Sequence, residues 1–198
     1  MKKIASVICL FTILMSFFAC DFVLKDTSSE STSQVELKTA VELVDEKIIN
    51  LERPTSRDSY KRALEVVEQA YEDLSDSEKK QVSNYSLLVN AREVYNYLCM
   101  KEKAEGNIKY IISYNLLNPE SLQVHSCVVT MYKVEDEFYI NAYIDYSAQN
   151  RMGGYSRKSE DRYYKWNKEN EGLESVGPFD FLENAMKGEV YDPKWLGD

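Results

Sequence analysis

The sequence has little histidine and cysteine, and these scarcities exclude several kinds of site. Its 198 residues include one histidine, His125, and four cysteines, of which Cys9 and Cys20 lie near the N-terminus. The remaining cysteines are too scattered to give the ligand spacing of a metal site. A Ser–His–Asp site would need His125 as its base, and the adjacent Ser126 points to the opposite face of a strand. We therefore expect no metal, no cofactor and no catalytic residues of this kind.

Positive charge is also scarce. There are 24 lysines and arginines against 33 aspartates and glutamates, a net charge of −9. Removing the first 19 residues takes away Lys2 and Lys3, which leaves 22 basic residues against 33 acidic ones, or −11. Nucleic-acid phosphates and anionic lipid headgroups both require a basic face. The charge therefore argues against nucleic acid as a partner and against electrostatic docking on a membrane.

Only one long apolar run is present, and it lies at the N-terminus. Lys2 and Lys3 precede the run Ile4–Phe18, which ends in Phe17-Phe18-Ala19-Cys20. The run is shorter than the roughly 20 residues that span a bilayer, and a basic start followed by a short apolar stretch is typical of a signal peptide. We expect residues 1–19 to be a signal peptide. Ordinary signal peptidase requires a small residue at position −3, where Phe17 stands.

The end of this run resembles the lipobox of bacterial lipoproteins. In that motif a small residue precedes a cysteine that receives diacylglycerol before cleavage, and Ala19 and Cys20 match it, while Phe17 replaces the usual leucine. The resemblance implies lipidation at Cys20 and attachment to the extracytoplasmic side of the cell membrane. Residues 20–36 contain the polar, small run DTSSESTSQ and no apolar period, which indicates a lipidated flexible tether. Cys99 and Cys127 remain, either as a disulfide or as two buried thiols.

Residues 37–104 show helical periodicity. Three apolar stripes recur at spacings of three and four residues, and the first ends at Pro54. We expect Thr55 or Ser56 to cap the second helix, and Ser75 with Glu78 to form a capping box. Three stripes of this width predict a three-helix bundle. They consist of Leu37, Val41, Val44, Ile48 and Leu51; Tyr60, Leu64, Val67, Tyr71 and Leu74; and Leu88, Ala91, Tyr95, Leu98 and Cys99.

Part of this region resembles a helical spacer repeat found in surface proteins of Gram-positive, low-GC bacteria. The repeat has the form AYxxLxxxxKxxVxNYxxLxxAE, and Arg92 stands where it has an acid. The resemblance covers about a third of the chain and implies a spacer, with the change at Arg92 confined to the surface. The matching residues are Tyr71, Leu74, Lys79, Val82, Asn84, Tyr85, Leu88 and Ala91.

Residues 105–198 have a different composition, and we place a domain boundary at Glu105-Gly106-Asn107. A helix is expected over residues 108–117, followed by strands over 124–133, 138–146 and 156–166. Gly177-Pro178 precedes a last short helix that we expect Gly188 to close. The fold class is thus α+β: a three-helix bundle followed by a small antiparallel-sheet domain with flanking helices.

This half resembles a small domain of uncharacterised bacterial lipoproteins and exported proteins, which implies architecture but no activity. In that domain an NPxS-like segment precedes one strand and an NxxGGY segment follows another. The matching residues are Asn118, Pro119, Ser121, Val124, Ser126, Asn150, Gly153, Gly154 and Tyr155.

Tyrosines and amides near a glycine pair are the candidate binding residues. Aromatic and amide side chains together suit protein or carbohydrate surfaces, although such tyrosines are also ordinary strand formers. The glycines are expected to form a turn with positive φ, with Gly154 the more important of the two. The candidates are Tyr143, Tyr146, Asn150, Gly153, Gly154 and Tyr155.

The sequence thus predicts a membrane-anchored lipoprotein that presents a binding module on a helical spacer. Its partners would be the membrane, through the lipid on Cys20, and a protein or a cell-wall carbohydrate. The alternative is a hydrolase of cell-wall polymer that uses Asp145 or Glu160, since paired carboxylates can cleave glycosidic bonds.

Overall fold

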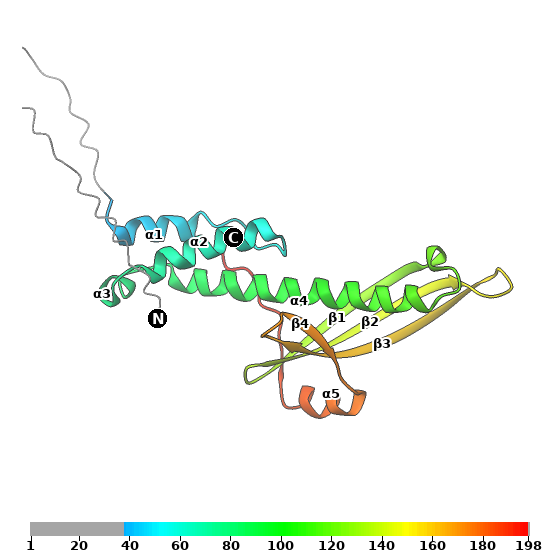
Figure 1. The fold of residues 1–198 in the computed structure, drawn as a ribbon. Helices are drawn as coiled ribbons and strands as arrows, with labels where there is room; N and C mark the ends of the chain where they lie inside the picture. Colours follow the sequence, from blue (N-terminus) through cyan, green and yellow to red (C-terminus); the bar gives the residue numbers. More distant parts are fainter. Residues whose placement is uncertain (1–37, 198) are drawn as a thin grey trace, which may run out of the picture. The chain divides into compact units, whose positions relative to one another are not determined.

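The computed structural model describes residues 38–197, so the expected signal peptide (1–19) and the whole of the expected tether (20–36), with Cys20, lie outside the described residues. The fold is α+β, as the sequence predicts (Figure 1). The helices are α1 (Ala40–Ile49), α2 (Asp58–Glu72), α3 (Asp76–Lys79), α4 (Tyr85–Asn115) and α5 (Pro178–Ala185), with a 3-10 turn at Pro119–Ser121. The strands are β1 (Gln123–Val134), β2 (Glu137–Gln149), β3 (Tyr155–Asn167), β4 (Gly172–Ser175) and β5 (Glu189–Val190).

Local capping explains where the first helices begin. Thr39 and Glu42 form a capping box at the start of α1, which the sequence analysis did not identify. The capping box of Ser75 and Glu78 is confirmed at α3. The expected cap of α2 by Thr55 or Ser56 is wrong, because the N-cap residue is Arg57, which makes no side-chain capping bond.

Helix α4 is longer than predicted. It runs without a break through Glu105–Asn107, so the predicted end of the helix there is wrong. A glycine inside a helix costs about 1 kcal/mol relative to alanine, but here the apolar stripe continues on both sides of Gly106. Burial of that stripe holds the helix together across the glycine. Its members recur every four residues: Met100, Ala104, Ile108 and Ile112.

A first hydrophobic core lies among α1, α2 and the N-terminal half of α4. The described apolar residues of the predicted stripes contribute to this core or pack against it, with the exception of Leu98. Its buried members are Val44, Ile48, Tyr60, Leu64, Val67, Leu74, Val82, Leu88, Ala91 and Tyr95.

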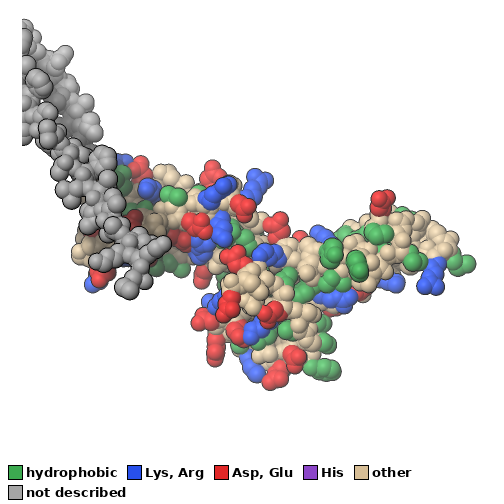
Figure 2. All heavy atoms as spheres, in the orientation of Figure 1, with side chains coloured by type: hydrophobic (Ala, Val, Ile, Leu, Met, Phe, Trp, Pro, Cys, Tyr) green, Lys and Arg blue, Asp and Glu red, His purple; other side chains and the backbone are tan. Residues whose placement is uncertain are grey.

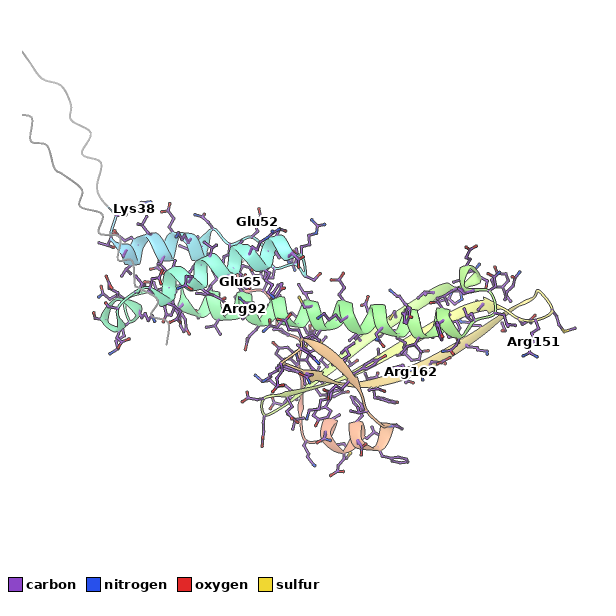
Figure 3. All side chains as sticks on the ribbon, viewed as in Figure 1. Lys38, Glu52, Glu65, Arg92, Arg151 and Arg162 are labelled. Atoms are coloured by element: carbon purple, nitrogen blue, oxygen red, sulfur yellow. The ribbon has the colours of Figure 1, made fainter. Side chains whose placement is uncertain are left out.

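Arg92 connects two of these helices. Its guanidinium group donates to the Glu68 carboxylate, with Nε at 2.7 Å from Oε1, and it lies over the Tyr95 ring. It therefore lies on the side of α4 that faces α2 (Figure 3). The expectation that the change at Arg92 is confined to the surface is wrong, because this side chain is half-buried and pairs across the helix interface.

The sheet is antiparallel and has the order β4-β3-β2-β1-β5. The three long strands coincide closely with the predicted ones. Strands β4 and β5 were not predicted, because segments of four and two residues are too short to show alternation. The last helix is confirmed as α5, but Gly188 is not a positive-φ cap. A Cβ there would meet the Lys133 carbonyl oxygen at 2.7 Å, so a close approach to β1 explains this glycine.

Two helices cover opposite faces of the sheet (Figure 1). The face of β2 that carries Ile140, Ala142 and Ile144 packs against α4 and forms a second core. The other face of the same strand carries Tyr139, which packs with Phe181 and Ala185 of α5. This division of β2 into two faces follows from the alternation of side chains along a strand.

The C-terminal segment connects the two cores. After β5 it returns along α4, where Asn90 bonds to the backbone of Lys194 and Leu196 and Trp195 packs against the first core. The chain from Lys38 onward forms one compact unit. The boundary predicted at residues 104 and 105 therefore falls inside a continuous helix that contributes to both cores.

Candidate functional site

The predicted glycine turn is the loop between β2 and β3. Asn150 organises it, since its side-chain oxygen accepts bonds from the N–H groups of Met152 (2.9 Å) and Gly154 (3.1 Å). Gly153 has φ of +83°, whereas Gly154 is outside the left-handed region. The turn is confirmed, but the expectation that Gly154 is the more important glycine is wrong. Arg151 also projects from this loop (Figure 3).

The candidate tyrosines do not share one surface. Tyr146 is buried beneath α4 and its hydroxyl donates to Glu160 at 2.8 Å. Tyr143 lies on the opposite face of β2, and Tyr155 is 53 % exposed at the start of β3. Of the six predicted residues, only Tyr146 and Asn150 line a common hollow, which has a volume of about 230 Å³.

Exposed apolar side chains gather around this end of the sheet and the C-terminal end of α4. Met152, at 95 % exposure, is the extreme case in the β2–β3 loop. Apolar side chains are visible along this part of the surface in Figure 2. The large ones are Tyr110, Tyr114, Leu117, Val124, Met152 and Tyr155.

The two acids of the hydrolase alternative face opposite sides of the sheet. Glu160 is paired with Ile144, so it shares the α4 face, whereas Asp145 is on the other face. Each already has partners: Asp145 bonds to Arg157, and Glu160 bonds to Tyr146 and Arg162. The Arg157 guanidinium holds the pKa of Asp145 below its usual value. This arrangement does not provide two carboxylates flanking one bond.

The β-bulge pairs Ser126 with Asp145, so the expectation that His125 and Ser126 face opposite sides is wrong, but the serine that His125 contacts is Ser147. The His125 Nε2 lies 2.7 Å from the Ser147 hydroxyl on the neighbouring strand, and both side chains are on the face that carries Asp145. The Asp145 carboxylate, however, is bound by Arg157. The group resembles a polar cross-strand network more than a nucleophile and base aligned by an acid.

A larger cavity, of about 620 Å³, lies among the start of α2, the middle of α4 and the ends of β2 and β3. Its aromatic members include Phe138 and Trp166, and Lys103 lies 5.2 Å from the centre of the Trp166 ring. Lys61 of α2 pairs at 3.5 Å with Glu171 in the loop between β3 and β4. Aromatic faces and charges of both signs fit a small polar ligand, and the two contacts also hold α4 and α2 to this end of the sheet.

The thiol in this cavity is not activated. Burial raises the pKa of Cys99, although the Tyr95 hydroxyl and Lys103 act in the opposite direction. Burial likewise raises the pKa of Cys127. Thiols rather than thiolates therefore predominate, and they are poor nucleophiles. Both cysteines are free, so of the two alternatives the structure has the unpaired thiols.

Residues 38–197 contain no group of three or more His, Cys, Asp or Glu side chains that could hold a metal ion. In the same part of the chain, no helix is both long and apolar enough to cross a membrane. Comparisons with family models, with curated proteins and with solved structures each found no match to this sequence.

Proposed function

We propose that this protein is a lipoprotein of the cell envelope, anchored in the membrane through lipid on Cys20, that presents a binding module on a helical spacer. Residues 1–19 act as the signal peptide and residues 20–36 as the tether. The first helices and the N-terminal half of α4 act as a three-helix spacer. The sheet and the C-terminal half of α4 form the interaction module for a protein or a cell-wall carbohydrate.

The observation that carries this proposal is the course of α4. Its 31 residues extend about 45 Å at 1.5 Å per residue. The Asp45 carboxylate of α1 accepts bonds from the N–H groups of Ser83 and Asn84. The first helix of the described chain is therefore fixed beside the start of α4. The sheet packs on the other half of the helix. A rigid element of this length would hold the sheet away from the site of attachment.

The hydrolase alternative receives no support from the sheet, because Asp145 and Glu160 point away from each other. Replacing each acid singly, by Asn and Gln respectively, tests it on purified cell-wall polymer. We expect no polymer cleavage by the wild-type protein and hence no loss in either variant. Cleavage that disappears in one of them would favour the hydrolase.

Cell fractionation tests the anchor. We expect wild-type protein in the membrane fraction and Cys20→Ser protein unprocessed or released, because a hydroxyl cannot form the thioether bond to the lipid. Two acyl chains give stable membrane residence, whereas one gives only reversible binding. Cys99→Ser is the matched control and should fractionate as the wild type does. A cleaved Cys20→Ser protein that stays on the membrane would contradict the proposal.

A further inference from the structure

The two edges of the sheet are only partly covered. Strand β5 pairs with Tyr132 and Lys133, so residues 123–130 of β1 have no strand beside them in the described part of the chain. On the other side β4 pairs with Tyr164–Asn167, which leaves residues 155–162 of β3 open. Open edges present unpaired backbone N–H and C=O groups to any extended chain.

One hydrogen bond, at the point where β5 stops covering β1, shows which way the backbone N–H and C=O groups of β1 point. Tyr191 donates its N–H to the Met131 carbonyl oxygen at 2.9 Å, so the backbone groups of Met131 point outward. In an antiparallel ladder alternate residues point the same way. The N–H and C=O groups of Cys127 and Val129 therefore point outward too. The β-bulge between Val124 and Ser126 ends this regular stretch.

Only one of the two edges is protected by charge. Proteins commonly prevent unwanted strand pairing by placing charged side chains along an edge. The β3 edge has five of them, whereas residues 123–130 of β1 include no lysine, arginine, aspartate or glutamate. Val128 is 53 % exposed at the centre of this unprotected edge. The five on β3 are Arg157, Lys158, Glu160, Asp161 and Arg162.

Helix α4 gives the β1 edge a local charge pattern. On one flank of α4, Lys103 lies 5.2 Å from the Trp166 ring and Asn107 accepts a bond from the Tyr164 hydroxyl, so this flank faces β3. Lys101, Glu105 and Lys109 recur every four residues on the opposite flank of the helix, which faces β1. Glu105 is 3.8 Å from Lys109. Two lysines against one glutamate leave this row with net positive charge.

We propose that residues 123–130 of β1 bind an extended segment of a partner protein, which adds to the sheet as a further strand. The segment carries acidic side chains on the face toward Lys101 and Lys109 and apolar side chains on the face beside Val128. Backbone hydrogen bonds to Cys127 and Val129 supply affinity, and the alternating side chains supply specificity. This deepens the proposed binding role and does not depend on the lipid anchor.

A second copy of the chain fits this edge less well. Two β1 edges paired about a two-fold axis at Cys127 would set the two rows of α4 charges antiparallel. Lys101 would then oppose Lys109, and Glu105 would oppose its own counterpart, so like charges would meet. The net charge of −9 adds a general repulsion between copies.

Two synthetic octapeptides test the proposal with the full chain, one alternating valine with glutamate and the other valine with lysine. We expect the glutamate peptide to slow hydrogen exchange at the Cys127 and Val129 amides, and the lysine peptide and an N-methylated glutamate peptide to leave it unchanged. Unchanged exchange with all peptides, or protection on β3 instead, would overturn the proposal. So would protein that dimerises through β1 without peptide, seen by sedimentation, because that identifies a second copy as the occupant.

A matched pair of charge reversals tests the acidic preference. Lys109 lies beside β1 and Lys158 lies on the β3 edge, so Lys109→Glu and Lys158→Glu make the same charge reversal at the two edges. We expect the first to weaken binding of the glutamate peptide about tenfold, because like charges then meet, and the second to have little effect. Equal effects of the two variants would show that net charge, and not the α4 row, sets the preference. If the peptide does not bind but the protein is still retained in the membrane fraction, the inference about β1 is refuted and the proposed lipid anchor on Cys20 is unaffected.

Discussion

Asn90 and Lys194 lie 104 positions apart in the sequence, and the side-chain amide of Asn90 donates a 2.9 Å hydrogen bond to the Lys194 carbonyl oxygen. The amide oxygen of Asn90 accepts a 3.0 Å bond from the N–H of Leu196. Asn90 is one of two buried polar residues in the described chain. It thus satisfies its own polar atoms and fixes the C-terminal segment on α4.

Replacement of Asn90 by alanine should release this segment. Two backbone groups would lose their partners, and we expect a decrease of about 1–3 kcal/mol in the free energy of unfolding. Urea denaturation measures the loss, and faster exchange of the Leu196 amide locates it. Asn184→Ala is the control, because the side-chain amide of Asn184 donates to the exposed Asp180 carbonyl within the same helix. Equal losses in the two variants would contradict the special role of Asn90.

The glycine turn distinguishes its two glycines. Gly153 has φ of +83° and open space around its Cα, so a side chain there is strained by the backbone alone. We expect Gly153→Val to lower stability by about 1–2 kcal/mol and Gly153→Ala by less. At Gly154 an added Cβ would meet the Asn150 amide at 3.5 Å, an ordinary contact, so Gly154→Ala should have little effect. Melting temperatures of the full chain measure the difference, and a larger effect at Gly154 would refute it.

Asp45 should make stability depend on pH. Burial raises the pKa of this carboxyl, but bonds from the backbone N–H groups of Asn84 and Ser83 and from the Asn84 amide together outweigh burial, so the net pKa is lowered. A lowered pKa in the folded state contributes stability above the unfolded-state value of about 3.9, and this contribution is lost as pH falls through the folded-state value.

Asp45→Asn should therefore be less stable than wild type at neutral pH, with the gap closing in acid. Urea midpoints measured at pH 7 and at successively lower pH test this expectation. Glu46→Gln, a change on the neighbouring exposed residue, serves as the control. A gap that stays constant as pH falls would show that the charge of Asp45 is unimportant.

Tyr60 offers a case in which removing a polar atom should not weaken the fold. Its hydroxyl is buried without a hydrogen-bond partner, and burial raises its pKa to about 12. A buried polar group without a partner costs about 1–3 kcal/mol. Tyr60→Phe keeps the ring that stacks on Tyr95 at 6.0 Å, so we expect unchanged or higher stability by urea denaturation. A clear loss would mean that the hydroxyl has a partner in solution.

Periodic segments were the predictable part of this fold. The faces of β2 and the stripes of α1 and α2 follow from alternation and from helical spacing, because each element buries one side of itself. Gly106 was misleading, since its local preference suggests a break while the stripe from Met100 to Ile112 continues across it. Tertiary packing decided that case.

The remaining features depend on contacts between distant residues. Strand β5 exists because Tyr132 and Lys133 offer it an edge, and Trp195 is half-buried against the first core because Asn90 fixes the segment around it. Neither effect has a local pattern. The candidate site was predicted as six residues near the glycine pair, but alternation along β2 places Tyr143 and Tyr146 on opposite faces of the sheet, which the sequence could already have shown. The unprotected edge of β1 could be recognised only after the strand order was known.

The mass of the mature N-terminus tests the central claim most directly. Protein purified from the membranes of cells that make it should have lost residues 1–19 and should begin at Cys20, with the added mass of diacylglycerol on the sulfur. Intact-protein mass spectrometry, followed by sequencing of the N-terminal fragment, measures both features at once. A protein that retains residues 1–19, or one cleaved there with no lipid on Cys20, would contradict the account.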